Sequence, residues 1–136
     1  MRYIAVDRRG SYLWVTFSRP DKLNVLHAED LPGLRDIVVN LGPGVTGLVF
    51  TGAGPAAFSA GMNIETFVGM DRAGAKAFIG QLAGIMRAIR RAPVVTVAAA
   101  ARPHHPAFPR RPFIERFSQA GMLSLLIQVG AVPAPV

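Results

Sequence analysis

Residues 50–65 read FTGAGPAAFSAGMNIE, and this segment decides the fold. The residues just before it, 45–50, form a short apolar run bounded by turn residues, which predicts a strand covered on both faces. The glycines and small residues within it predict a loop, and its last residues predict the start of a helix. Strand, loop and helix start in this order aim backbone N–H groups at an anion. The segment therefore predicts an α/β connection that also forms a binding site.

The flanking segments predict an alternation of strands and helices. Apolar residues at helical spacing predict a helix over 30–41 with Asp30 as N-cap, and a second over 72–91 with Asp71 as N-cap. β-branched and aromatic runs predict four strands, at residues 3–6, 12–17, 45–50 and 94–99. The first two strands are expected to pair as an antiparallel hairpin. Alternation of this kind predicts an α/β fold.

The character of the sequence changes after residue 99. Prolines recur at every third position from 103 to 112, a spacing that suits polyproline II and neither a helix nor a central strand. We therefore divide the chain into a folded domain, 1–100, and a Pro/Arg-rich tail, 101–136, with a short amphipathic helix over 113–129. A shift of reading frame or an internal deletion near residue 99 is one hypothesis for this change. Translating the genomic DNA in the other frames tests it.

Composition limits the classes of protein. The 136 residues suffice for one domain. The net charge of +7 comes from basic residues scattered along the chain, which argues against a nucleic-acid interface. The chain has no cysteine and no apolar run of signal-peptide length, and its most apolar run, 92–101, is about half of the roughly 20 residues that span a bilayer. We expect a cytoplasmic protein that does not insert into a membrane.

Four motifs carry a resemblance to a known family. They are SRPDKLNVL at 18–26, VFTGAG at 49–54, AFSAGMNI at 57–64 and APVVTVAA at 92–99. Over residues 3–99 the chain resembles the crotonase family, which includes enoyl-CoA hydratases and isomerases. The resemblance implies a ββα spiral, here truncated, and a trimer or hexamer. It also implies an acyl-CoA thioester as substrate, so that coenzyme A arrives as part of the substrate and no cofactor is bound permanently.

The resemblance also implies the roles of individual residues. The backbone N–H of Met62, at a helix start whose dipole would reinforce it, is the expected oxyanion donor, and Gly61 permits the sharp turn before it. Arg19 and Lys22 are either charge partners of the coenzyme A phosphates or solvated loop residues. Two loop segments are expected to line the coenzyme A pocket: Lys22, Leu23, Asn24 and Val25 in one, and Ala60, Gly61, Met62, Asn63 and Ile64 in the other.

Other polar residues have simpler interpretations. Glu65 favours a helix N-terminus, and His27 is expected to be a surface or capping residue rather than a base. His104 and His105 have no carboxylate or cysteine at ligand spacing, so no metal site is expected. Asn63 stands where the family often has Asp.

The sequence after residue 99 departs from the family pattern. It reads Ala100-Ala101-Arg102-Pro103, where the resemblance implies a glycine-rich turn that supplies the second oxyanion donor. Catalytic glutamates are absent too, since Glu115 is the only carboxylate after Asp71. We therefore expect binding rather than turnover and leave open whether the chain is an enzyme. The alternative is a non-catalytic interaction protein that docks its PxxP tail onto an aromatic groove.

Overall fold

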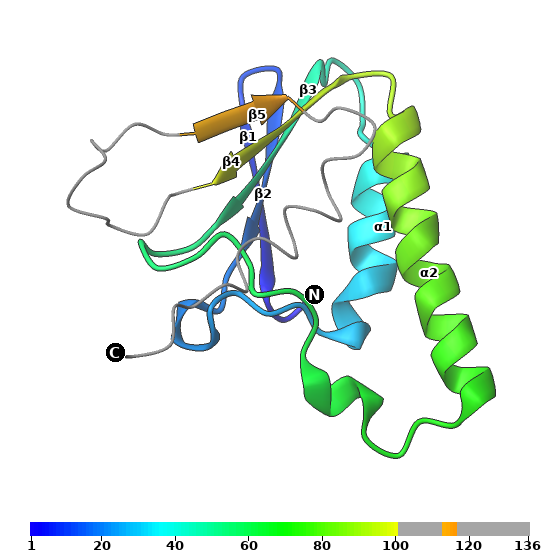
Figure 1. The fold of residues 1–136 in the computed structure, drawn as a ribbon. Coiled ribbons are helices and arrows are strands. Elements are labelled where there is room, and N and C mark those ends of the chain that lie inside the picture. The colour runs from blue at the N-terminus through cyan, green and yellow to red at the C-terminus, as the bar shows by residue number, and fades with distance from the viewer. Residues whose placement is uncertain (101–112, 117–136) are drawn as a thin grey trace.

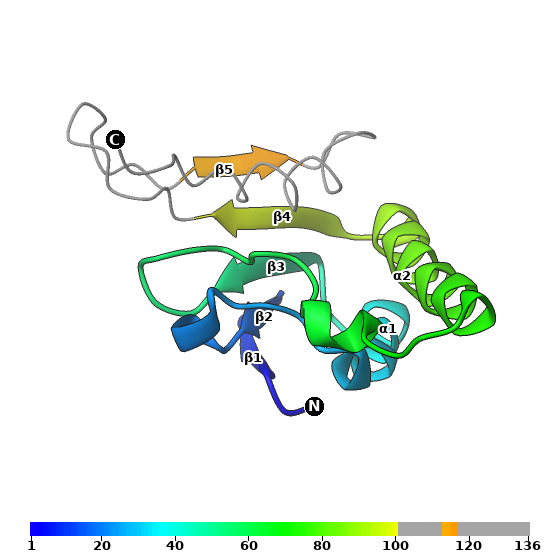
Figure 2. The same ribbon diagram turned by 60° about the horizontal axis from the view of Figure 1, so that its bottom comes forward.

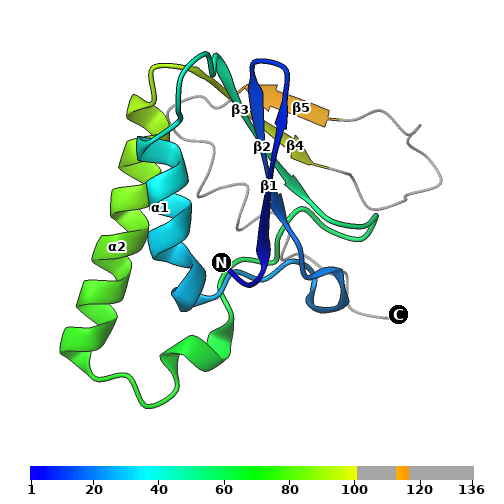
Figure 3. The same ribbon diagram turned by 180° about the vertical axis from the view of Figure 1, so that it is seen from behind.

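An antiparallel hairpin begins the fold. The structure, a computed structural model, describes residues 1–100 and 113–116. Strands β1 (Ile4–Arg9) and β2 (Tyr12–Phe17) pair with Ile4 opposite Phe17. Figure 3 shows this hairpin from behind. Gly10 makes the turn at a φ of 61°, a left-handed conformation that glycine adopts without steric cost. The predicted hairpin is confirmed.

Three further strands complete the sheet. β3 (Gly47–Gly52) pairs parallel to β2, and β4 (Val95–Ala100) pairs parallel to β3. β5 (Phe113–Arg116) pairs antiparallel to β4, so that the strand order is β1-β2-β3-β4-β5. Because β2, β3 and β4 are parallel, their carboxyl ends meet at one edge of the sheet (Figure 1).

Two α-helices lie on the same side of the sheet (Figures 1 and 2). They are α1 (Leu31–Val39), which a short 3-10 helix η2 (Ala28–Asp30) precedes, and α2 (Arg72–Arg91). The Asp71 side chain caps α2 by accepting a hydrogen bond of 2.7 Å from the Gly74 N–H, as predicted. Both helices were predicted from apolar residues at helical spacing.

Asp30 does not cap α1 with its side chain, so that prediction is wrong. Its backbone already has helical angles, φ −87° and ψ −16°, because η2 runs directly into α1, whereas an N-cap residue needs an extended backbone. Its carboxylate is 1% exposed and accepts hydrogen bonds from the N–H groups of Arg2 (2.7 Å) and Tyr3 (3.3 Å). Asp30 therefore holds the chain that enters β1.

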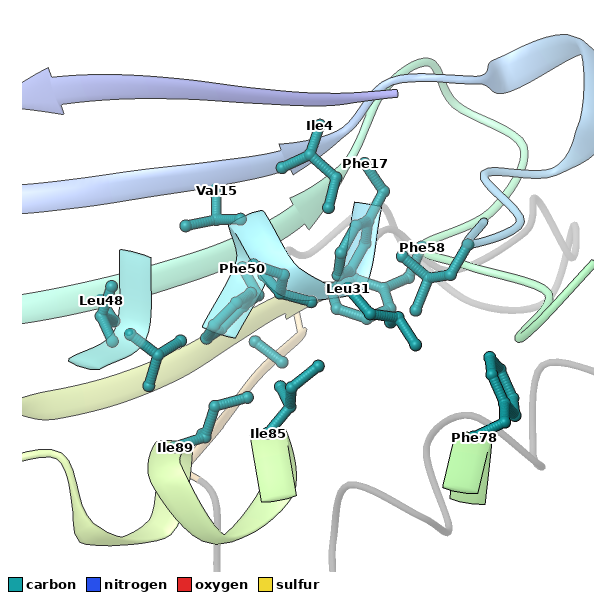
Figure 4. Packing of buried hydrophobic residues seen from close by; sticks show 14 residues of the cluster. Ile4, Val15, Phe17, Leu31, Leu48, Phe50, Phe58, Phe78, Ile85 and Ile89 are labelled. Carbon is teal, nitrogen blue, oxygen red and sulfur yellow. The ribbon is translucent and has the colours of Figure 1, made fainter. Parts of the chain in front are cut away.

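The hydrophobic core lies between the sheet and the two helices (Figure 4). Within this core, the Phe17 ring contacts two other rings. The Phe50 ring stacks on it with centroids 6.3 Å apart, and the Phe58 ring packs edge-on against it at 5.4 Å. Phe58 comes from the loop after β3 and is 2% exposed, so this loop is anchored in the core. The other labelled members come from the strands and helices: Ile4, Val15, Leu31, Leu48, Phe78, Ile85 and Ile89.

The predicted helix over 113–129 does not begin where it was expected. Its first four residues form β5, which pairs with the outer side of β4 between Ala100 and Val97. The remainder of that helix and the proline-rich segment, 101–112, lie outside the described residues. No helix in the described part of the chain is long and apolar enough to cross a membrane.

Candidate functional site

Two loops leave the carboxyl edge of the sheet and run side by side. One follows β2 and the other follows β3, and Figure 1 shows both below the strands. Three backbone hydrogen bonds join them. Leu26 N–H donates to Gly61 O (2.8 Å), Asn63 N–H donates to Leu26 O (2.9 Å), and Ala60 N–H donates to Leu23 O (2.8 Å). The structure thus brings together the two segments that the sequence predicted to line one pocket.

The buried amide of Asn24 organises the first loop. The residue has a φ of 56°, which asparagine tolerates better than most residues, and it is 1% exposed. Its Nδ2 donates to Ala53 O (2.9 Å) and Ala57 O (2.7 Å), while its Oδ1 accepts from the Arg19 N–H (2.9 Å). All its amide groups are therefore used within the protein. The side chain shapes the site and does not face a ligand.

Ser59 continues this network into the second loop. Its side chain is fully buried, and its Oγ donates to Asn24 O (2.8 Å) and accepts from the Gly61 N–H (3.1 Å). Gly61 has a φ of 93°, a conformation that side chains rarely adopt. The predicted need for glycine at this turn is confirmed. Sequence patterns did not reveal the role of Ser59, because a serine among small loop residues carries no local signal.

The backbone N–H of Met62 has no hydrogen-bond partner among the described residues. The N–H before it donates to Ser59 Oγ and the N–H after it donates to Leu26 O. Within residues 1–100 and 113–116, the Met62 N–H donates to no protein acceptor. The Met62 side chain packs against the core. The sequence-predicted oxyanion donor is thus an unused donor at the edge where three parallel strands end.

A helix dipole does not reinforce this donor, so that part of the prediction is wrong. The element that follows, η3 (Ile64–Phe67), is a four-residue 3-10 helix that starts two residues after Met62. So short an element carries little of the macrodipole of an α-helix. The Asn63 Oδ1 caps it by accepting from the Glu65 N–H (3.3 Å), and the Glu65 carboxylate accepts from Asn63 Nδ2 (3.3 Å).

The two predicted cations of the first loop have different surroundings. The Arg19 guanidinium lies over the Tyr3 ring at 4.7 Å and contacts Nε2 of His27, whose own ring lies 4.6 Å from that of Tyr3. Arg19 is therefore engaged by the start of the chain. Lys22 is exposed and forms no salt bridge with any described residue. His27, which was expected to be a surface or capping residue, is half-buried, and its side chain makes no capping hydrogen bond.

The remaining predicted lining residues are apolar and largely accessible. Leu23 is 44% exposed and Ile64 is 81% exposed. Val25 is half-buried and Ala60 is exposed. Among the described residues, no group of three His, Asp or Glu side chains is close enough to hold a metal ion. The site therefore consists of backbone groups, apolar side chains and one accessible lysine.

Several solved structures superpose on most of this chain. No family model matches the chain, and no curated protein matches it. DspI from Pseudomonas aeruginosa superposes with a TM-score of 0.69 at 28% identity, over 74% of this chain and 39% of that one. An enoyl-CoA hydratase from Thermoplasma volcanium superposes with a TM-score of 0.64 at 31% identity, over 71% of this chain and 39% of that one.

An enoyl-CoA hydratase/isomerase from Mycobacterium paratuberculosis gives a TM-score of 0.63 at 28% identity, over 73% of this chain and 41% of that one. The chain thus spans about 40% of the length of the solved structures that it matches. These matches agree with the resemblance that the sequence motifs carry over residues 3–99. The chain contains a partial crotonase-like domain, with the mixed α/β fold of enoyl-CoA hydratase/isomerase structures.

Proposed function

We propose that the protein binds acyl-CoA thioesters, with the Met62 N–H as hydrogen-bond donor to the thioester carbonyl. The observation that carries this proposal is the unused Met62 N–H, held between two N–H groups that have partners in the protein. Ligands of open α/β sheets bind where parallel strands end, and this donor lies at that edge. The similar structures include enzymes named as enoyl-CoA hydratases, whose name gives the class of ligand.

The chemistry of a thioester suits a fixed backbone donor. Attack on the thioester, or removal of a proton next to its carbonyl, places negative charge on the carbonyl oxygen. A preorganised N–H donor aimed at that oxygen contributes on the order of 3 kcal/mol to its stabilisation. Because the donor is a backbone group, a methionine at position 62 keeps it and changes only the shape of the acyl site.

Coenzyme A would lie along the two joined loops. In this proposal Lys22 is the charge partner of its phosphates, since this side chain is exposed and forms no salt bridge with any described residue. Arg19 is the weaker candidate because Tyr3 and His27 engage its guanidinium. The apolar Leu23 and Ile64 would face the less polar parts of the ligand.

Binding rather than turnover is the activity that we propose. The sequence after Ala100 offers no glycine-rich turn for a second donor and no carboxylate apart from Glu115. A single donor polarises a carbonyl, whereas hydration or isomerisation of an acyl-CoA also needs groups that move protons. The trimer or hexamer that the resemblance implies is part of the same proposal.

The test compares two variants of Met62. Proline removes the N–H, whereas alanine keeps it and shortens the side chain. Crotonyl-CoA is added to every variant at 100 times its dissociation constant for the wild type. It should stabilise the wild type and Met62→Ala by about 2.7 kcal/mol, measured as a thermal shift. Met62→Pro should lose at least half of this stabilisation, and because both variants lose the core contacts of the methionine, each thermal shift is measured against the ligand-free melting temperature of the same variant. Equal stabilisation of both variants would contradict the proposal.

A further inference from the structure

The position of Ser59 suggests a function for a residue to which the sequence motifs assign no role. Its hydroxyl is fully buried and has two partners, the carbonyl of Asn24 at 2.8 Å and the N–H of Gly61 at 3.1 Å. A hydroxyl can donate one hydrogen bond and accept another, so this one links the two loops. No water can replace it without rearrangement of the loops, because Ser59 is buried.

The two peptide planes next to the Gly61 Cα are each fixed by a hydrogen bond. Ser59 Oγ accepts from the Gly61 N–H and holds the plane before Gly61. Leu26 N–H donates to Gly61 O at 2.8 Å and holds the plane after it. That second plane also contains the Met62 N–H. In a trans peptide the C=O and N–H point in opposite directions, so the Met62 N–H points away from Leu26.

Gly61 is the least constrained residue between these planes. Glycine has access to more backbone conformations than any other residue, and a φ of 93° at this position has no side chain to hold it. No heavy atom lies within 4 Å of the place where a Cβ would be. No side-chain contact at Gly61 itself therefore holds this turn, whereas the hydrogen bonds of Ser59 and Leu26 fix the peptide planes on either side of it.

We infer that Ser59 is a positioning residue, whose hydroxyl sets the direction of the Met62 N–H toward a bound thioester carbonyl. The ligand in this inference comes from the proposed function. The effect of the Ser59 hydroxyl on the backbone does not depend on that proposal. Asn24 assists, since its buried amide holds the loop whose carbonyl accepts from Ser59. Leu26 holds the Gly61 carbonyl through its main-chain N–H, which a side-chain substitution does not remove. Ser59 is therefore the residue whose side chain can be changed to test the orientation of the Met62 N–H.

The chain offers a control for the loss of a hydroxyl that is hydrogen-bonded within the protein. The half-buried Thr51 Oγ1 donates to Ala99 O at 3.0 Å and so joins β3 to β4, and it forms no hydrogen bond with either loop of the site among the described residues. Thr51→Val removes that hydrogen bond in the same way that Ser59→Ala removes those of Ser59. A difference in site behaviour between Ser59→Ala and Thr51→Val then reports the orientation of the turn at Gly61, and not only a loss of overall stability.

The first measurement uses the ligand-free full chain. In Ser59→Ala, amide hydrogen exchange at Gly61 should become about tenfold faster or more, because the Gly61 N–H loses its acceptor, the Ser59 hydroxyl. Exchange at the Gly61 amide in Thr51→Val should match the wild type. Unchanged exchange at Gly61 in Ser59→Ala would overturn the inference. If Ser59→Ala does not fold, Ser59→Cys, which keeps a weak donor and acceptor, is measured in its place.

The second measurement adds crotonyl-CoA labelled with ¹³C at the thioester carbonyl. Hydrogen bonding to Met62 N–H should move the carbonyl resonance of the bound ligand downfield in the wild type and in Thr51→Val. Ser59→Ala should lose most of this shift. A full shift in Ser59→Ala would overturn the inference. No bound signal in the wild type would instead count against the proposed function, and the exchange measurement would still decide the role of Ser59.

Discussion

At the scale of single residues, the side-chain nitrogen of Asn24 makes two of the hydrogen bonds that join the two loops of the site. Asn24 Nδ2 reaches two carbonyl groups that lie 29 and 33 positions further along the chain, at 2.9 and 2.7 Å. A carboxylate oxygen in place of Nδ2 could not donate a hydrogen bond to either carbonyl oxygen. The difference between asparagine and aspartate, which have nearly the same shape, is therefore decisive at this position.

Asn24→Asp should lower the free energy of unfolding by about 3 kcal/mol or more. A buried unsatisfied polar group costs about 1–3 kcal/mol, and a charged group costs more. The matched control is Asn63→Asp at an exposed pair, where a carboxylate still accepts from the Glu65 N–H but no longer donates to the Glu65 carboxylate. Because water screens the two exposed carboxylates, we expect the control to lower stability by less than about 1 kcal/mol. Urea unfolding curves measure both, and equal stability of the two variants would contradict the role of Asn24.

At the scale of elements, the end of β3 approaches the loop that follows it very closely. A Cβ at Gly52 would lie 2.3 Å from Phe58 O and 2.4 Å from Ala57 O, distances that real Cβ atoms do not adopt. Because both are backbone atoms, the loop cannot give way without moving Phe58 out of the core. The glycine is required by the close approach and not by its backbone angles.

Gly52→Ala should therefore destabilise the protein, by about 1–3 kcal/mol, the usual cost of overpacking. Gly80→Ala should do the opposite. Gly80 lies on an exposed part of α2, and no neighbouring atom lies within 4 Å of the place where its Cβ would be. Alanine in a helix is more favourable than glycine by about 0.5–1 kcal/mol. Thermal unfolding of both variants measures this difference in sign. Destabilisation by both would show that the approach at Gly52 is not the cause.

Elements were predictable where their signals are local. The Asp71 cap reaches Gly74, three positions away, and the hairpin turn needs only Gly10. The site depends instead on contacts between distant positions, such as Ser59 to Asn24 across 35 residues and Arg2 to Asp30 across 28. No periodicity encodes such pairs. The position of Met62 was predictable only because four motifs occur together in a known order.

At the scale of the whole molecule, one face of the sheet has helices and the opposite face does not, among the described elements (Figure 2). Tyr12 of β2 and Val95 of β4 both pair with Gly47 of β3, and they are 47% and 49% exposed. Ile64 and Val68, beside the site, are each 81% exposed. Apolar surface of this kind is typical of sheets that pack against another layer.

We expect the protein to form a homo-oligomer or to aggregate. Burial of the exposed apolar residues by another copy removes them from water, at about 25 cal/mol for each Å² of apolar surface. Light scattering coupled to size exclusion measures the mass. Val95→Lys should shift the population toward smaller species if that face is buried. A monodisperse monomer of the wild type would contradict the expectation.

The two fixed peptide planes around Gly61 also have a consequence for the kinetics of binding. Backbone that is already ordered in the free protein loses little conformational entropy when a ligand arrives. Association at the Met62 N–H should then be a single step whose observed rate rises linearly with ligand concentration. When the Ser59 hydroxyl is absent, the turn must order during each encounter, and the observed rate should level off at high concentration.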